Sequence, residues 1–259
     1  MTPTTRGPLD ANAELVSRQA WNERLWSLVV RPDRRPATPF EPGQFAQLGL
    51  PVDGVLEKRA YSLASSARDR EVYELLISRV DDGRLTGALA RLAPGERCWL
   101  DERVFGRFTL AEVPRDADLV MVATGTGLAP YLSMLRTYAD EPRWRRFVLV
   151  HGVRLAEDLA YRDELSERAA RDERVCYLPV VSREPAGGAW SGLRGRVQRV
   201  LEGESCRELA GVALDPKRCH VFLCGNPAMI DEVGAVLVER GFRAGSARRG
   251  GNLHVERYW

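Results

Sequence analysis

The chain has 259 residues, of which 44% are hydrophobic and 29% charged, and its net charge is +2. This composition is that of a folded globular protein and excludes a disordered chain, while the length accommodates one large domain or two medium ones. The small net charge gives no reason to expect nucleic-acid binding, and no apolar run reaches the roughly 18 residues of a membrane span. The first residues lack the apolar core of a signal peptide, so we expect a cytoplasmic protein without membrane insertion.

Short strand patterns dominate the chain up to residue 113. Runs rich in aromatic and β-branched residues occupy positions 26–30, 44–48, 59–64 and 72–80, with Gly, Pro and Asp turns between them. One short helix is predicted over 86–92. Strands at this spacing predict an antiparallel β-barrel or sandwich.

Strand and helix patterns alternate in the remaining residues. Strands are predicted at 119–123, 147–150, 175–181 and 221–223, and helices around 131–138, 157–171, 197–201 and 229–237. Such alternation predicts a parallel sheet with helices on both faces. Pro114 lies in the expected linker, which predicts domains over 1–113 and 114–259.

The segment 123–130, Ala-Thr-Gly-Thr-Gly-Leu-Ala-Pro, follows the first strand of this second domain and opens a helix. Its two glycines allow close backbone approach to a ligand, and free N–H groups at a helix start favour phosphate. A tight turn that binds no ligand would explain the same pattern. The motif alone is therefore a weak indication of a nucleotide site.

A second motif, Cys224-Gly225-Asn226-Pro227, also lies between a strand and a helix. Asn226 is expected to cap the helix and Pro227 to occupy its first turn. An efficient helix start explains three of the four residues, and Cys224 can be read as an ordinary core cysteine. The five cysteines have no spacing typical of zinc or iron–sulfur ligands, so no metal site is predicted; they are Cys98, Cys176, Cys206, Cys219 and Cys224.

In the first domain, Arg59-Ala60-Tyr61-Ser62 lies on a predicted strand, with Arg59 and Tyr61 on one face. An arginine beside a tyrosine can neutralise a phosphate and stack on a ring, although an exposed cation–π pair is the simpler interpretation. Downstream, the turn from Gly83 into the short helix, with the Thr86 hydroxyl, is a second candidate phosphate contact.

Together these motifs resemble the ferredoxin–NADP reductase family, and within it the bacterial ferredoxin/flavodoxin–NADP reductases. The resemblance runs from about Trp21 to Trp259 and includes the ending Val-Glu-Arg-Tyr-Trp. It implies an N-terminal antiparallel Greek-key β-barrel that binds FAD, followed by a Rossmann-like α/β domain that binds NADP(H). It also implies hydride exchange with NADP(H) and single-electron exchange with ferredoxin or flavodoxin, by a protein expected to be a monomer.

The resemblance also implies roles for individual residues. Ser62 and Cys224 would flank the hydride path, Glu256 would relay protons, and Tyr258 would stack where nicotinamide enters. Trp259 would pack on the adenine of FAD. The residues expected to bind FAD are Arg59, Ala60, Tyr61, Ser62, Leu75, Leu76, Ile77, Ser78, Gly83, Arg84, Leu85, Thr86, Thr124, Tyr258 and Trp259.

The preference for NADP over NAD rests on three arginines that follow successive strands, Arg154, Arg183 and Arg196. The carboxyl ends of strands in an open sheet converge, and guanidinium groups there suit a 2′-phosphate, whereas an NAD site offers a carboxylate to the ribose. The residues expected to bind NADP are Gly125, Thr126, Gly127, Val153, Arg154, Ser182, Arg183, Arg196, Cys224, Gly225, Asn226 and Pro227.

Two arginine clusters, at 143–146 and 240–249, are candidates for steering an acidic carrier, although solvated loops explain them equally well. Two other functions stay open. The chain could be an NAD(P)H reductase component that feeds an oxygenase, or a flavin-binding sensor without turnover.

Overall fold

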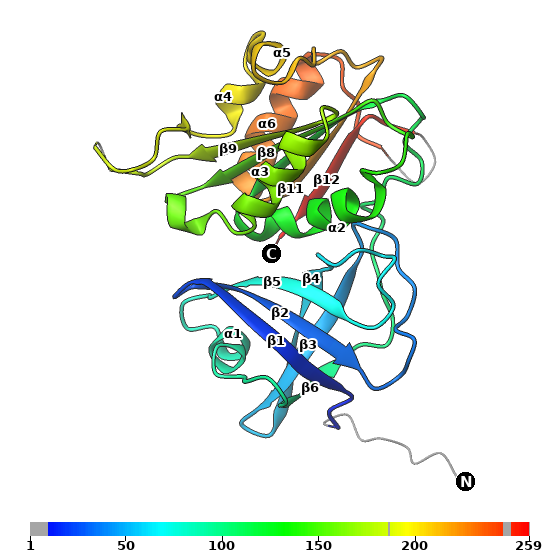
Figure 1. The fold of residues 1–259 in the computed structure, drawn as a ribbon, viewed down its shortest axis with the longest axis vertical. Coiled ribbons are helices and arrows are strands. Elements are labelled where there is room, and N and C mark those ends of the chain that lie inside the picture. Colours follow the sequence, from blue (N-terminus) through cyan, green and yellow to red (C-terminus); the bar gives the residue numbers. More distant parts are fainter. Residues whose placement is uncertain (1–9, 186, 246–249, 259) are drawn as a thin grey trace. The chain divides into compact units, whose positions relative to one another are not determined.

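The computed structural model describes residues 10–185, 187–245 and 250–258. By its internal contacts the chain divides into two compact units, Met1–Thr109 and Leu110–Trp259. In Figure 1 the first unit runs from blue to cyan and the second from green to red.

The first unit is an antiparallel sheet with the strand order β4-β3-β6-β1-β2-β5. A bridge between Leu63 and Leu75 joins the two ends of this order, which closes the sheet into a barrel. Inward-facing residues such as Trp26 and Leu48 are fully buried in its core. The elements are β1 (Ala13–Asn22), β2 (Leu25–Pro32), β3 (Phe45–Val52), β4 (Val55–Ser62), β5 (Tyr73–Ser78), α1 (Arg84–Leu89) and β6 (Arg97–Leu100).

The second unit is a parallel sheet with the order β10-β9-β8-β7-β11-β12. The central strands β7, β8 and β11 are nearly continuous buried runs because both faces are covered. Helices α4, α5 and α6 pack on one face through a cluster that includes Val120, Val150 and Ile230. Helices α2 and α3 lie on the other face (Figure 1).

The bounds of the second unit's elements complete the description. They are β7 (Asp118–Thr124), η1 (Gly125–Leu128), α2 (Ala129–Tyr138), β8 (Arg146–Val153), η2 (Ala156–Asp158), α3 (Arg162–Arg171), β9 (Val175–Val181), β10 (Leu193–Arg194), α4 (Gln198–Leu201), α5 (Ser205–Ala210), β11 (Cys219–Gly225), α6 (Pro227–Glu239) and β12 (Leu253–Arg257). The predicted fold class, an antiparallel barrel followed by a parallel α/β sheet, is confirmed.

Two predicted helices differ from the structure. The helix expected over 86–92 is α1, which spans Arg84–Leu89, and the Thr86 hydroxyl inside it contacts the preceding turn at Val80 and Gly83. The continuous helix expected over 157–171 is broken. Residues 156–158 form a short 3₁₀ turn, and buried Tyr161 has left-handed backbone geometry (φ 58°), so α3 begins only at Arg162.

Candidate functional site

The order of the parallel sheet reverses at β7. The chain moves from β7 outward to β8 and β9, then returns to place β11 on the other side of β7. In open α/β sheets the ligand crevice lies beyond the carboxyl ends of the strands at such a reversal. The two motifs 124–127 and 224–227 are the carboxyl ends of β7 and β11, so the fold brings both predicted motifs to this switch point.

Two glycines allow the strand ends to approach each other closely. A Cβ on Gly127 would lie 2.3 Å from the Cys224 carbonyl oxygen. A Cβ on Gly225 would lie 2.4 Å from Thr124 Oγ1, and Gly225 has a φ of +125° that L side chains rarely adopt. Both glycines are therefore needed for the close packing of the two strand ends, whereas Gly125 and Asn226 are the exposed residues of the two motifs.

Asn226 begins helix α6 as the sequence predicts. Its side-chain oxygen accepts hydrogen bonds from the N–H groups of Ala228 (2.8 Å) and Met229 (3.4 Å), and Pro227 occupies the first turn. The Asn226 N–H donates to Thr124 Oγ1 at 2.9 Å, which ties the two strand ends together. The interpretation of Asn226-Pro227 as a helix start is confirmed. The same residues also lie at the carboxyl end of the parallel sheet.

The C-terminal strand places Glu256 and Tyr258 at the same point. Glu256 pairs in register with Cys224, and the Cys224 Sγ lies 3.9 Å from Glu256 Oε1. The Tyr258 hydroxyl donates to the Thr126 carbonyl at 3.4 Å, and its N–H donates to the Gly225 carbonyl at 3.3 Å. Trp259, predicted to contact adenine, lies outside the described residues.

The Cys224 thiol is protonated in this environment. Its side chain is fully buried, and burial raises its pKa well above the usual range, with the nearby Glu256 carboxylate raising it further. A buried neutral thiol is a weak hydrogen-bond donor and a poor nucleophile. Covalent chemistry at Cys224 is therefore disfavoured, and the thiol can contact a ligand ring only after the side chains that cover it, Tyr258 among them, move.

The three predicted arginines follow β8, β9 and β10, which are neighbours in the sheet. The Arg183 N–H donates to the Arg154 carbonyl at 2.8 Å, so the residues after β8 and β9 are held side by side. Arg196 lies in the loop after β10, and its guanidinium is 3.7 Å from Glu232. All three side chains are exposed, which leaves them available to an anionic ligand.

In the first unit, Arg59 and Arg84 share one carboxylate that the sequence reading missed. Glu57 Oε1 lies 3.1 Å from Arg84 and Glu57 Oε2 lies 3.8 Å from Arg59. Glu57 and Arg59 are two residues apart on one strand and so share a face, a pattern that was visible in the sequence. The structure thus brings together two predicted FAD contacts, with Glu57 between their guanidinium groups.

The Tyr61 phenol stays neutral because burial raises its pKa to about 12, against the opposing charge of Arg59. Ser62, next along β4, is buried. The predicted segment Leu75–Ser78 belongs to β5, which pairs with β2 along one edge. In the described chain no strand pairs with its other edge beyond Leu75, which leaves backbone groups there for a ligand.

Thr86 is placed differently from the other candidates. Its hydroxyl accepts from the Val80 N–H at 3.2 Å and lies 3.3 Å from the Gly83 carbonyl. The Thr86 hydroxyl therefore stabilises the turn before α1. The groups left to form the predicted phosphate contact are the backbone N–H groups of Gly83 and Leu85.

The predicted carrier cluster at 143–146 is largely engaged within its own unit. Arg145 forms an ion pair with buried Asp118, Arg146 donates to the Glu173 carbonyl, and Arg143 lies over the Trp144 ring. The second cluster falls partly on residues 246–249, outside the described residues. The structure gives the first cluster a structural role.

His151 supplies a pH dependence of stability. It is 1% exposed in β8, and burial lowers its pKa to about 4, against about 6.5 in an unfolded chain. As the pH falls, the unfolded state binds the proton first, so the His151 contribution to stability is constant above pH 6.5 and declines between about 6.5 and 4. His254, whose pKa is also lowered to about 4 by burial and by His220, acts in the same direction.

We expect the His151 contribution to this loss to be on the order of 3 kcal/mol. Urea denaturation of the wild type and of His151→Gln at several pH values from 7.5 to 4.5 would measure it. The stability difference between the two proteins should shift in favour of the glutamine variant as the pH falls. Parallel curves would contradict the assignment.

Comparison with known proteins agrees with this architecture. An oxidoreductase FAD-binding domain model matches residues 15–101, and an oxidoreductase NAD-binding domain model matches residues 121–234. No helix in the described part of the chain is both long and apolar enough to cross a membrane. The fold and the site therefore define a two-domain oxidoreductase with an FAD-binding and an NAD-binding domain.

The relatives identify the family. The flavodoxin/ferredoxin–NADP reductase of Escherichia coli (strain K12) is 38% identical over 93% of this chain and 95% of its own length, and ferredoxin–NADP reductase A of Sorangium cellulosum is 35% identical over 92% and 86%. A ferredoxin NADP⁺ reductase structure from Neisseria gonorrhoeae, with bound FAD and NADP, superposes with a TM-score of 0.86 at 26% identity, covering 95% of this chain and 97% of that one. The chain belongs to the flavodoxin/ferredoxin–NADP reductase family, and the family resemblance drawn from the motifs is confirmed.

Proposed function

We propose that this protein transfers electrons between NADP(H) and ferredoxin or flavodoxin, with FAD held by the first unit and NADP(H) by the second. The observation that carries the proposal is the switch point, where Thr124–Gly127, Cys224–Asn226 and Tyr258 meet in a chain 38% identical to a flavodoxin/ferredoxin–NADP reductase. When bound, FAD accepts a hydride and releases electrons singly, which is the chemistry that links a nicotinamide to a one-electron carrier.

The residues of the first unit fit FAD. Arg59 and Arg84 supply guanidinium groups for its diphosphate, and Glu57 holds the two side chains in one place. Neutral Tyr61 offers an aromatic face for the flavin ring, and the adjacent Ser62 hydroxyl is a donor for a ring nitrogen. The free edge of β5 offers backbone groups to the same ligand.

The residues of the second unit fit NADP(H). The bare backbone at Gly125–Gly127 and the capped start of α6 suit the diphosphate, and Arg154, Arg183 and Arg196 suit the 2′-phosphate. Tyr258 lies against the switch point and would have to move when nicotinamide enters. The neutral Cys224 thiol would pack on the ring, and the Glu256 carboxylate beside it is the group able to take or give a proton.

The absorbance spectrum of the purified protein tests this function. We expect flavin absorbance that anaerobic NADPH bleaches faster than NADH at equal concentration, and reoxidation by a purified flavodoxin or ferredoxin. Protein without flavin, or flavin that NADPH leaves oxidised, would exclude the reductase and favour a flavin-binding sensor. Bleaching without electron transfer to either carrier would favour a reductase component for another partner.

A further inference from the structure

His151 is a buried histidine on β8, the strand that neighbours β7 in the sheet, and it is 1% exposed. In the parallel register it stands opposite Ala123, two residues before Gly125. The preceding residues on the same face of β8, Phe147 and Leu149, are apolar and fully buried. The polar imidazole therefore interrupts an apolar face close to Gly125.

Polar groups from two neighbouring segments contact this imidazole. The ring donates a hydrogen bond to the Gly125 main chain, and its Nδ1 lies 3.3 Å from the Tyr177 hydroxyl on β9. A main-chain carbonyl can only accept, so the ring nitrogen that faces Gly125 carries a proton. Burial raises the pKa of Tyr177, so its phenol stays protonated as a partner of the ring. These contacts compensate for the cost of burying a polar ring.

The Gly125 carbonyl, which His151 fixes, belongs to an exposed turn. Gly125 begins η1 and has a φ of +55°, in the left-handed region. Among the described residues, its chain neighbours apart, no heavy atom lies within 4 Å of the position of a Cβ here. In a trans peptide the carbonyl oxygen and the following N–H point in opposite directions. Because the Gly125 carbonyl points to a buried ring, the Thr126 N–H points away from the core.

The Thr126 N–H is suited to bind an anion. It is among the first N–H groups of η1, which have no partner inside the helix. A left-handed residue followed by helical ones gathers such N–H groups around a concave anion site. A hydrogen bond to the carbonyl of a peptide also polarises that peptide and strengthens its N–H as a donor. His151 can therefore influence anion binding at this turn from the buried side.

We propose that His151 is a positioning residue for the diphosphate of the nicotinamide nucleotide. It holds the Gly125 carbonyl inward, so that the Thr126 N–H is directed at the diphosphate, and Tyr177 orients its ring. The inference rests on the proposed function, because the diphosphate site at Gly125–Gly127 is part of that proposal. NADP and NAD share the diphosphate, so loss of His151 should affect both nucleotides, in contrast to loss of Arg183 or Arg196.

His151→Leu tests the proposal, because leucine fills a similar volume but neither donates nor accepts a hydrogen bond. Isothermal titration calorimetry of the flavin-loaded protein would measure the Kd of NADP⁺ and of adenosine 2′-monophosphate, which carries the 2′-phosphate but no diphosphate. We expect the Kd of NADP⁺ to rise about tenfold and that of adenosine 2′-monophosphate to stay within about twofold. At saturating NADPH, kcat for ferricyanide reduction should also stay within about twofold, because His151 contacts no reacting atom.

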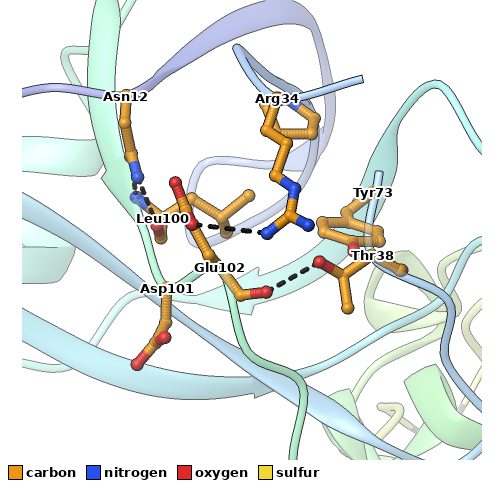
Figure 2. A pocket seen from close by; sticks show the side chains of 8 residues that line it. Asn12, Arg34, Thr38, Tyr73, Leu100, Asp101 and Glu102 are labelled. Carbon is orange, nitrogen blue, oxygen red and sulfur yellow. Dashed lines mark hydrogen bonds and ion pairs between the residues drawn. The ribbon is translucent and has the colours of Figure 1, made fainter. Parts of the chain in front are cut away.

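Three further variants identify the cause. His151→Gln restores an N–H donor and should return the Kd of NADP⁺ to within about threefold of the wild type. Leu149→Ala opens a cavity on the same face of β8 and lowers stability without removing the hydrogen bond. Asn12→Leu removes the two hydrogen bonds between the Asn12 side chain and the Leu100 main chain in the first unit, drawn as dashed lines in Figure 2. Leu149→Ala and Asn12→Leu should both bind NADP⁺ as the wild type does.

The positioning role would be wrong if His151→Leu weakened both ligands equally, or if Leu149→Ala weakened NADP⁺ binding as much. Failure of His151→Gln to recover binding would overturn the hydrogen bond as the cause. If His151→Leu does not fold, Tyr177→Phe provides the test: it should raise the Kd of NADP⁺ about two- to fivefold, and an unchanged Kd would contradict the proposal. A wild-type protein that binds neither ligand would refute the proposed function itself, a result distinct from failure of the positioning role.

Discussion

Replacing Gly225 with alanine is expected to lower the free energy of unfolding by about 3 kcal/mol or more and to impair NADP(H) binding. The backbone φ of +125° costs an L residue on the order of 1–3 kcal/mol. The added Cβ would also lie 2.4 Å from Thr124 Oγ1 and 2.6 Å from the Thr124 carbonyl oxygen. Relief of that clash separates β11 from β7 at the point where the ligand is proposed to bind. Urea denaturation and the KM for NADPH measure the two effects.

Gly234→Ala is the matched control. Gly234 lies inside helix α6 of the same unit, and nothing stands within 4 Å of the position of its Cβ. Alanine there should stabilise the protein by up to about 1 kcal/mol, because glycine is a poor helix former. If Gly225→Ala matched the wild type within about 0.5 kcal/mol, the close approach of the two strand ends would be wrong.

Gly127→Ala distinguishes the two causes of the expected loss, which are the steric contact of the added Cβ and the unfavourable backbone φ. Its φ does not lie in the left-handed region, but a Cβ would lie 2.3 Å from the Cys224 carbonyl oxygen. The cost of this variant therefore comes from the contact alone. A large loss in both variants would assign the effect to strand-end packing, whereas a loss confined to Gly225→Ala would assign it to the backbone angle.

Much of this fold could be predicted because its signals are local. The apolar runs of β7, β8 and β9 and the Asn226-Pro227 helix start each identify an element from a few consecutive residues. The elements that were missed have weak local signals. β1 contains register shifts after Leu15 and Ala20 that interrupt the alternation of buried residues, and β6 and β10 span only four and two residues.

The candidate site likewise has parts that could be predicted from local sequence patterns and parts that could not. The motif residues at 59–62, 124–127 and 224–227 were recognisable as short patterns, and the parallel sheet brings the last two together. Pairings between distant residues were not predictable. The arrangement of Phe45 on Phe105, and the engagement of Arg145 by Asp118, depend on the tertiary fold. The number of arginines in a segment therefore says little about which of them are available to a partner.

The interruption between η2 and α3 has a tertiary cause as well. Tyr161 is buried with the Arg136 guanidinium 5.1 Å from its ring centroid, and Arg136 also pairs with Glu164 in α3. These contacts come from α2, a neighbouring element, and compensate for the left-handed geometry at Tyr161. These contacts with α2 could not be predicted from the charge pattern of residues 157–171.

Replacing Arg183 or Arg196 with alanine is expected to raise the KM for NADPH by about 10–100-fold and to change the KM for NADH by less than about threefold. A charge-assisted hydrogen bond to the 2′-phosphate contributes about 1.5–3 kcal/mol, and each 1.4 kcal/mol is a factor of ten in affinity. NADH lacks that phosphate and therefore loses nothing with the guanidinium. Steady-state kinetics with both nucleotides and ferricyanide as acceptor measure the two KM values.

Arg171→Ala is the control for the loss of one exposed arginine. Its side chain is 79% exposed on α3, and among the residues that the structure describes it pairs only with Glu167 of the same helix. It should leave both KM values unchanged. Arg196→Lys, which keeps the charge but loses the planar fork, should fall between the wild type and Arg196→Ala. Because the Arg196–Glu232 pair is exposed and 3.7 Å long, its removal should leave the unfolding free energy nearly unchanged. Equal losses for NADPH and NADH would show that these arginines hold a part of the nucleotide common to both, and the assignment of the 2′-phosphate site would be wrong.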